Sequence, residues 1–156
     1  MDIRNRVEVM HGVNLDQLGR RDREHYGSLT LMELEMGISE AAADLGLSTR
    51  FFQTNHEGAF VEHLHGLAGM ADAIILNPGA WTHYSYAIRD ALELTRLPAV
   101  EVHLSNVEER EPFRRESVIR DLCVARVAGR GQDGYRDALT RLQAELSRPQ
   151  EELSRP

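Results

Sequence analysis

Hydrophobic positions along the chain follow two patterns that alternate from one end to the other. Short apolar runs are separated by longer segments in which apolar residues recur every three or four positions, the spacing of a helix face. The run over residues 73–76 is continuously apolar, which is typical of a strand covered on both faces of a sheet. Thr30 and Glu33 have the spacing of a capping box at a helix start, and Gly46 suits the end of that helix. The pattern predicts strands over residues 7–11, 50–54, 71–76, 99–104 and 124–128, and helices over residues 31–45, 59–68, 84–94 and 135–146.

This order of elements also predicts the fold class. Neighbouring parallel strands need crossover connections, and a helix after each strand supplies them with a right-handed path. We therefore expect an α/β fold with a flavodoxin-like, doubly wound sheet of five parallel strands. The fifth strand is the weakest of the five predictions because Arg126 interrupts its apolar run. A single catalytic domain is expected over residues 1–147, followed by a disordered tail over residues 148–156.

Composition and charge restrict the class of protein. The 156 residues carry 18 basic and 25 acidic side chains, a net charge of −7, and one cysteine, Cys123. A single cysteine forms no intramolecular disulfide and fits a reducing compartment. Because no apolar run approaches the ~20 residues of a membrane span and the N-terminus lacks the apolar core of a signal peptide, we expect a cytoplasmic protein. The acidic balance argues against nucleic acid as a partner, and neither nucleic acid nor membrane is expected to bind.

Polar side chains gather where three of the predicted strands end, which is where open parallel sheets bind ligands. Glu101 and His103 lie two apart on a strand and therefore on one face. A carboxylate beside an imidazole fixes the tautomer and favours the protonated ring, which suits a general acid. A cation such as Arg21 near Tyr26 favours phenolate over phenol, which suits a base. The other candidates at these strand ends are Asn14, Asn77, His83 and Ser105, together with Arg110 and Arg114, which are predicted to lie one helical turn apart and to clamp a substrate carboxylate.

Two cofactor interpretations compete with acid–base chemistry. Glu101, His103 and His83 are residue types that ligate metals, but no paired-ligand motif accompanies them. Residues 129–134 have the spacing GxGxxG between a strand and a helix. No second strand follows to carry a ribose-binding acid, so a dinucleotide is not expected, and neither is a metal.

Four blocks of sequence occur in order over residues 7–117. They are Gly12-Val13-Asn14-Leu15 through Leu18-Gly19-Arg20-Arg21 to Tyr26-Gly27; Asn55-His56-Glu57-Gly58; Asn77-Pro78-Gly79-Ala80 with Thr82-His83 and Arg89-Asp90-Ala91; and Pro98 with Glu101-Val102-His103-Leu104-Ser105-Asn106, followed by Arg110, Phe113, Arg114 and Arg115. On these blocks the chain resembles the type II 3-dehydroquinate dehydratases, flavodoxin-like enzymes of the shikimate and quinate pathways. Several ordered motifs together are more specific than any one of them.

The resemblance implies a cofactor-independent hydro-lyase that converts 3-dehydroquinate to 3-dehydroshikimate through an enolate. It implies Tyr26 as the base, Arg21 as the cation that keeps it a phenolate, and His103 as the acid oriented by Glu101. Asn14 matches the residue that holds the water stabilising the enolate. The resemblance further implies a trimer-based dodecamer with no metal. Substrate-binding positions are implied at Asn77, His83, Leu104, Ser105 and Arg114, and at Asp90 supplied by a neighbouring subunit.

The chain also departs from the family pattern, and these departures keep alternatives open. His11 and Val13 stand where the family has Asn and Pro, and residues 116–121 replace its usual segment after the arginines. The changes concern the fit of the pocket and the subunit interfaces. The alternatives are a dehydratase of a related cyclic polyol acid, a phosphate- or nucleotide-binding module without catalysis, and a homologue that keeps only the scaffold.

Overall fold

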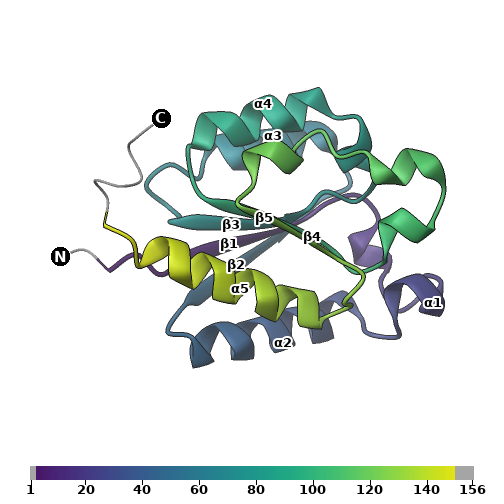
Figure 1. Cartoon of the computed structure of the whole chain (residues 1–156), viewed down its shortest axis with the longest axis horizontal. Coiled ribbons are helices and arrows are strands. Elements are labelled where there is room, and N and C mark those ends of the chain that lie inside the picture. Colours follow the sequence, from purple (N-terminus) through teal and green to yellow (C-terminus); the bar gives the residue numbers. More distant parts are fainter. Residues whose placement is uncertain (1–2, 150–156) are drawn as a thin grey trace.

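The architecture is a sheet of five parallel strands between two layers of helices, seen in a computed structural model that describes residues 3–149. The sheet order is β2-β1-β3-β4-β5, with β1 (Arg6–His11), β2 (Ser48–Gln53), β3 (Ala73–Asn77), β4 (Ala99–His103) and β5 (Ala125–Ala128). Helices α2 (Leu31–Asp44) and α5 (Asp133–Leu146) cover one face, and α3 (Glu57–His65) and α4 (Tyr86–Thr95) cover the other (Figure 1). This arrangement confirms the predicted flavodoxin-like, doubly wound fold.

The predicted strands and helices are all present, with bounds that differ by at most three residues. Thr30 caps α2 as expected, since its Oγ1 accepts a hydrogen bond from the Glu33 backbone N–H at 3.2 Å. The fifth strand, whose apolar run Arg126 interrupts, is also present, because β5 pairs in register with β4 through this residue. Short helices were not predicted, because segments of three to five residues are too brief to show a hydrophobic period. They are α1 (Arg23–Tyr26), η1 (Leu15–Gln17), η2 (Gly79–His83), η3 (Val107–Glu109), η4 (Pro112–Arg115) and η5 (Arg120–Leu122).

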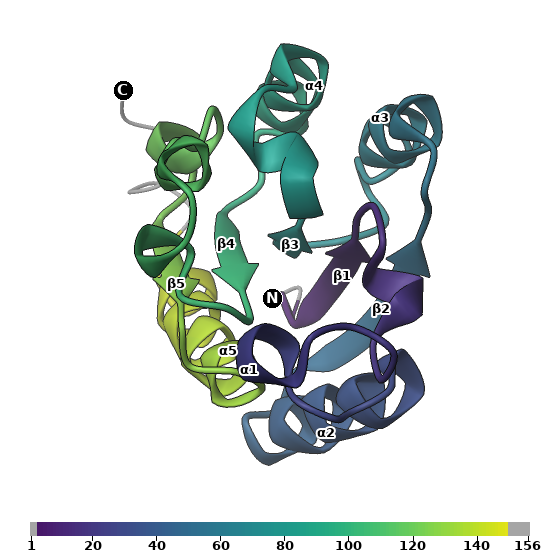
Figure 2. The same ribbon diagram turned by 90° about the vertical axis from the view of Figure 1, so that its right-hand side faces the viewer.

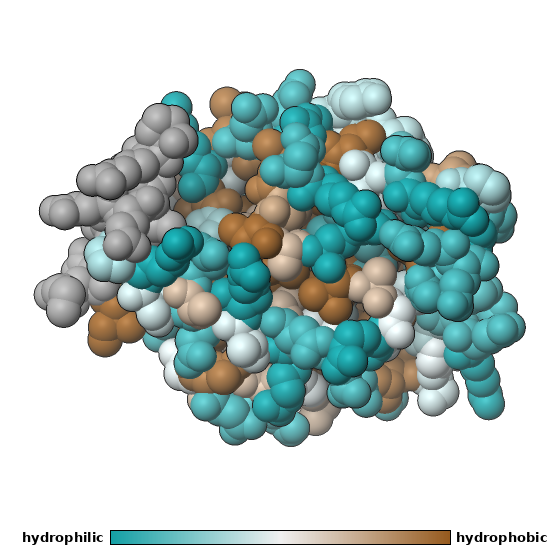
Figure 3. Space-filling model, in the orientation of Figure 1, coloured by the Kyte–Doolittle hydropathy of each residue, from teal (hydrophilic) through white to brown (hydrophobic). Residues whose placement is uncertain are grey.

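The central position of β3 in the sheet explains why its residues form a continuously apolar run. Ile75 packs into the core beneath α2 and α5, whereas Ile74 and Leu76 pack into the core beneath α3 and α4. Both cores are buried, so every position of this central strand must be apolar. The face of the molecule shown in Figure 3 is mainly hydrophilic, with hydrophobic side chains scattered across it.

The loops that follow β1 and β3 contact each other at the end of the sheet. At this point the two neighbouring strands connect to helices on opposite faces of the sheet. The Gly12 N–H donates to the Asn77 carbonyl at 2.8 Å. A Cβ on Gly12 would lie 2.2 Å from the Pro78 carbonyl oxygen, so only glycine fits there. The contact holds the loops after β1 and β3 together at the end of the sheet that faces the viewer in Figure 2. This crevice is the expected ligand site of the fold.

A second close approach accounts for part of the GxGxxG segment. Gly129 has φ +77°, and a Cβ there would lie 2.9 Å from the Cβ of Asn106. The glycine therefore lets the turn between β5 and α5 pack against the loop after β4. The expected tail begins at the end of α5, and its residues 150–156 lie outside the described part of the chain. Within residues 3–149, no helix combines the length and apolarity needed to cross a bilayer.

His11 ends β1 as a fully buried side chain whose ring stacks on Phe51 with centroids 6.1 Å apart. Neither ring nitrogen has a hydrogen-bond partner among the described residues. Its Nε2 lies 3.4 Å from Glu35 Oε1, but this contact is an ion pair only when the ring is protonated. Burial opposes protonation and lowers the pKa of His11 from 6.5 to about 4.

We expect the free energy of unfolding to decrease as the pH falls from about 6.5 to about 4. The unfolded state binds the proton of His11 first, so protonation favours unfolding in this window, by on the order of 2–3 kcal/mol at about 1.4 kcal/mol per pKa unit. Urea unfolding at pH 7 and pH 4.5, at one protein concentration, measures the effect. His11→Asn should lose less stability at pH 4.5 than the parent, whereas the exposed control His65→Asn should match the parent. Equal losses in the parent and His11→Asn would contradict the assignment.

Candidate active site

The predicted site residues converge beyond the carboxyl ends of β1, β3 and β4, where α1 and the short turns after β4 surround the strand ends (Figure 2). They line a cavity of about 110 Å³. A larger cavity of about 680 Å³ lies beside it and shares Tyr26, Leu104 and Ser105, but neither Arg21 nor His103 lines it. We therefore place the site in the smaller cavity. The predicted residues that line it are Asn14, Arg21, Tyr26, Asn77, His83, His103, Leu104, Ser105, Arg110 and Arg114.

Tyr26 lies at the end of α1 with two guanidinium groups on its hydroxyl. Arg21 Nη2 donates to Tyr26 Oη at 2.7 Å, and Arg110 Nη1 donates to the same oxygen at 2.6 Å. Arg21 also lies over the ring, with Cζ 3.6 Å from the ring centroid. Both guanidinium groups are cations that only donate, so negative charge that develops on this oxygen would be balanced through two hydrogen bonds. Burial lowers the pKa of Arg21, and the charge that can form on Tyr26 opposes this effect.

The prediction that Arg110 and Arg114 lie one helical turn apart is wrong. Arg110 follows η3, whereas Arg114 belongs to η4, which begins at Pro112. Proline starts a new turn, so the two side chains do not share one helix face. Arg110 contacts the Tyr26 hydroxyl, and Arg114 Nε donates to Glu111 Oε2 at 2.5 Å.

Glu101 and His103 form a directly bonded pair on β4. His103 Nε2 lies 2.5 Å from Glu101 Oε2, and both side chains are buried. Because a carboxylate only accepts, Nε2 carries the proton and Nδ1 is the nitrogen that can exchange a proton with a ligand. Glu101 also accepts hydrogen bonds from Thr82 at 2.5 Å and from Ser117 at 2.7 Å. Burial alone would raise the pKa of Glu101, but the three donors outweigh burial and hold this pKa below its ordinary value.

His83 presents a neutral ring to the cavity. Its Nδ1 lies 2.7 Å from the Glu116 carbonyl oxygen, which can only accept, so Nδ1 carries the proton and Nε2 has a free lone pair. Burial is the main cause that lowers the pKa of His83, and the charges of His103 and Arg114 act in the same direction. His83 can therefore accept a hydrogen bond from a ligand hydroxyl.

The two asparagines of the site are fixed by their backbones and neighbours. Asn14 has φ +69°, and its N–H donates to Asn55 Oδ1 at 2.8 Å. Asn77 is buried, and its Oδ1 accepts from the Gly79 N–H at 3.1 Å. This second bond leaves the Asn77 amide NH₂ as a donor for a ligand.

Asp90 is the one predicted site residue that the single chain does not bring near the cavity. It is exposed on α4 and is not among the residues that line the site. Its predicted contribution therefore requires a second subunit.

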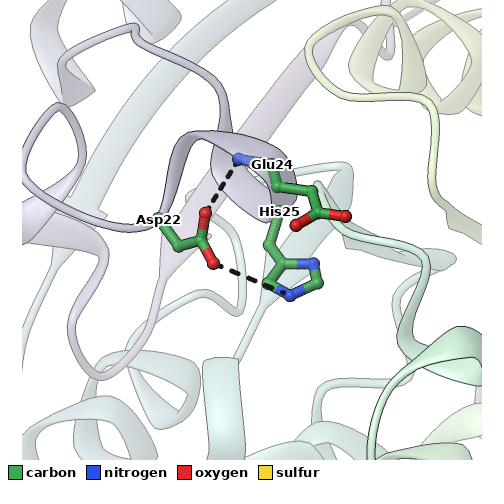
Figure 4. A group of neighbouring side chains, drawn as sticks. All are labelled: Asp22, Glu24 and His25. Carbon is green, nitrogen blue, oxygen red and sulfur yellow. Dashed lines mark hydrogen bonds and ion pairs between the residues drawn. The ribbon is translucent and has the colours of Figure 1, made fainter.

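The alternative of a metal held by Glu101, His103 and His83 gains no geometric support. Among residues 3–149, these three side chains do not form a group whose ligand atoms lie within 4.8 Å of one another, whereas Asp22, Glu24 and His25 do. Figure 4 shows that this second group is local to α1, where Asp22 accepts from the Glu24 backbone N–H at 2.9 Å and caps the helix. Helix capping explains the position of Asp22 without a ligand.

Sequence reasoning missed four contributors to the site environment. Thr82 was placed in a motif but given no role, and Ser117 fell within a segment that was interpreted only as a departure. Arg110 was assigned to a substrate carboxylate, and its bond to the Tyr26 hydroxyl was not foreseen. Arg126 was interpreted as an interruption of a strand, although a charged residue within an otherwise apolar strand signals a buried partner. These four residues surround the Glu101–His103 pair and the Tyr26 hydroxyl.

The fold and the site together define a flavodoxin-like α/β protein with a polar site at its strand ends. The sequence profile of the family described as dehydroquinase class II matches residues 5–143. The chain belongs to this family.

Individual relatives agree with this assignment. The chain is 49% identical over 131 residues to the 3-dehydroquinate dehydratase of Syntrophotalea carbinolica, and the alignment covers 83% of this chain and 88% of that protein. It is 48% identical over 134 residues to 3-dehydroquinate dehydratase 2 of Pseudomonas putida, covering 86% and 90%. The crystal structure of type II dehydroquinase from Propionibacterium acnes matches with a TM-score of 0.86 at 36% identity, covering 92% and 99%.

Proposed function

We propose that the protein dehydrates 3-dehydroquinate, the reaction for which its relatives are named, with Tyr26 as the base and His103 as the acid. The observation that supports these roles is a single cavity with two guanidinium groups on one phenol oxygen and a carboxylate-bound imidazole nearby. Removing a proton next to a ketone requires a base, stabilisation of the enolate, and an acid for the departing hydroxyl group.

The residues divide the reaction between them. The Tyr26 phenolate takes the proton from the carbon beside the ketone, and Arg21 and Arg110 balance its charge before the transfer. The electrons pass to the ketone oxygen as an enolate, which Asn14 stabilises through a water molecule. When the enolate collapses, the carbon–oxygen bond of the hydroxyl group breaks, and His103 supplies the proton that converts it to water. Substrate contacts are assigned to Asn77, His83, Leu104, Ser105 and Arg114.

The test is to mix the purified protein with 3-dehydroquinate and follow the enone absorbance of 3-dehydroshikimate. Turnover should persist with EDTA, because no step uses a metal. It should also persist with borohydride, because the chain contains no lysine that could form an imine. Loss of turnover after chelation, or no turnover at all, would contradict the proposal. A phosphate-binding module would show no turnover, and a dehydratase of another cyclic polyol acid would act on that compound in preference.

We propose further that the protein is a trimer-based oligomer, a dodecamer, in which Asp90 enters the site of a neighbouring subunit. Tyr86, Asp90 and Leu94 recur every four residues on α4, so they share one face of that helix. All three are exposed, Tyr86 by 68% and Leu94 by 71%, and such exposed apolar residues beside an acid suit a subunit contact.

Mixing two impaired variants tests the contribution of Asp90. Tyr26→Phe and Asp90→Asn should each lose activity, and subunits that are unfolded and reassembled together should regain it. With random mixing in a symmetric assembly, about a quarter of the sites combine an intact Tyr26 with a neighbour's intact Asp90. Light scattering of the parent should show the oligomer. A fully active monomer, or no recovery in mixtures that do reassemble, would contradict the arrangement.

The proposed location is the cytoplasm, where the partner is a small cyclic carboxylate. The lone Cys123 is partly buried, and burial raises its pKa to about 12. A neutral, partly buried thiol is unreactive. Its lack of reactivity is compatible with a reducing compartment but does not require one.

A further inference from the structure

Arg126 lies in the middle of β5, directly beside Glu101 in the register of the sheet. Its side chain is only 5% exposed, and Nε lies 3.7 Å from Glu101 Oε2. On the other side, Nη1 lies 3.8 Å from Oε1 of Glu108, a residue of η3. Neither Nε nor Nη2 has a hydrogen-bond partner within residues 3–149. A buried cation thus faces the carboxylate behind the acid without a hydrogen bond to it.

Folding alone gives no reason for a charge at this position. Burying a guanidinium that lacks good hydrogen bonds is costly, and an apolar side chain of similar size in its place is often neutral or stabilising. Glu101 does not need Arg126 to keep its orientation, because His103, Thr82 and Ser117 already donate to it. What Arg126 adds is a positive charge.

We propose that Arg126 is a positioning residue for His103, the acid of the site. Its fixed positive charge partly balances the Glu101 carboxylate, so His103 releases its proton more easily to the departing hydroxyl group. This inference rests on the proposed function. Without Arg126, the carboxylate would be balanced by the His103 imidazolium alone and would hold that proton more tightly. Arg126 also repels the protonated ring, so both effects have the same sign.

Other charged or titratable groups around the pair do not replace Arg126. On η2, His83 has its pKa lowered by burial and stays neutral near pH 7. From η4, Arg114 bonds to Glu111. Cys123, which precedes β5, is neutral because burial and then Glu101 raise its pKa to about 12. Arg110 is directed to Tyr26, and Glu108 lies on the far side of Arg126 and is 60% exposed.

The effect appears in the pH dependence of kcat. The acid must be protonated, so kcat declines at high pH as the acid loses its proton, while the low-pH limb reports the base. Removing the charge of Arg126 should move the high-pH limb upward by about one pH unit, because Glu101 loses a cation 3.7 Å away and its negative charge then acts on His103 alone. It should also lower the plateau of kcat by about threefold, because an acid that holds its proton more tightly transfers it more slowly. KM and the low-pH limb should stay unchanged.

The experiment records pH profiles of kcat and KM for the parent, Arg126→Met, Arg126→Lys and Arg130→Met. Arg126→Met removes the charge and keeps the volume, and Arg126→Lys should restore the parental limb. Arg130→Met is the matched control, because Arg130 is exposed and pairs with Asp137 on α5. In the Glu101→Gln background, Arg126→Met should shift the limb by clearly less than in the parent background, since the shared carboxylate is gone.

Each outcome decides the proposal. An unchanged high-pH limb in an active Arg126→Met variant would overturn the role of Arg126 and leave the proposed function intact. A raised KM with no shift of either limb would indicate a structural role only. If Arg126→Met does not fold, Arg126→Gln replaces it. If neither variant folds, Arg126→Lys decides the matter. A folded Arg126→Lys variant with a displaced high-pH limb would overturn the proposal. Absence of dehydration by the parent would overturn the proposed function, and this inference with it.

Discussion

Tyr26→Phe should lower kcat by a factor of about 10²–10⁴, the usual contribution of a general base, while KM changes little. The substitution removes only the hydroxyl oxygen on which Arg21 and Arg110 converge and keeps the ring beneath the Arg21 guanidinium. The substrate loses the group that accepts its proton but keeps its binding contacts. Steady-state kinetics with 3-dehydroquinate measure both constants.

Tyr84→Phe is the matched control, because Tyr84 is 59% exposed and the same atom is removed. Its kcat should equal that of the parent. If Tyr26 only anchored its loop, the variant would show a weaker KM with kcat nearly intact. That result would end the assignment of Tyr26 as the base.

Arg21, one of the two arginines that donate to the Tyr26 hydroxyl, allows a related prediction. Arg21→Ala should resemble Tyr26→Phe near neutral pH and recover in part as the pH rises, since hydroxide then supplies the phenolate. Its loss should be smaller than that of Tyr26→Phe, because Arg110 remains 2.6 Å from the hydroxyl oxygen.

His103→Ala should also lower kcat by a factor of about 10²–10⁴, but it should interrupt the reaction at a later point. The base half of the site is intact in this variant, so enolate formation continues while loss of the hydroxyl group stalls. The proton beside the ketone should therefore still exchange with solvent. NMR of 3-dehydroquinate incubated with the variant in D₂O measures the exchange, and Tyr26→Phe should abolish it.

His65→Ala serves as the control for this experiment, because His65 is exposed at the end of α3. It should turn over substrate at the parental rate. If His103→Ala lost exchange as completely as turnover, His103 would take part in the first proton transfer, and the division of labour would be wrong.

The fold could be predicted because its information is local and repeated. The five strands and the helices α2, α3, α4 and α5 each have a recognisable hydrophobic pattern of their own, and the order of elements alone restricts the topology. The pairing of Glu101 with His103 was equally accessible, because a two-residue spacing on a strand places both side chains on one face. The contact of 2.5 Å between His103 Nε2 and Glu101 Oε2 follows from that geometry.

The rest of the site depends on distances that no local pattern encodes. Ser117 reaches Glu101 across 16 positions, and Arg110 reaches Tyr26 across 84. Both lie next to single-turn helices that are too short for a period, and their partners are set by how the loops after β4 fold back. The interpretation of residues 116–121 only as a departure from the family pattern also missed a contact, because Ser117 within this segment donates to Glu101.

The two halves of the site are anchored in unequal ways. His103 and Glu101 lie on a fully buried strand with a neighbour on each side, whereas Tyr26 ends a four-residue helix in the loop between β1 and α2. Native-state amide hydrogen exchange should therefore be slow along β4 and fast at residues 23–26. Tyr26 is then subject to a local opening equilibrium that His103 does not share. Ligands that tighten the contacts of Arg21 and Arg110 would slow exchange in α1 without affecting exchange in the sheet.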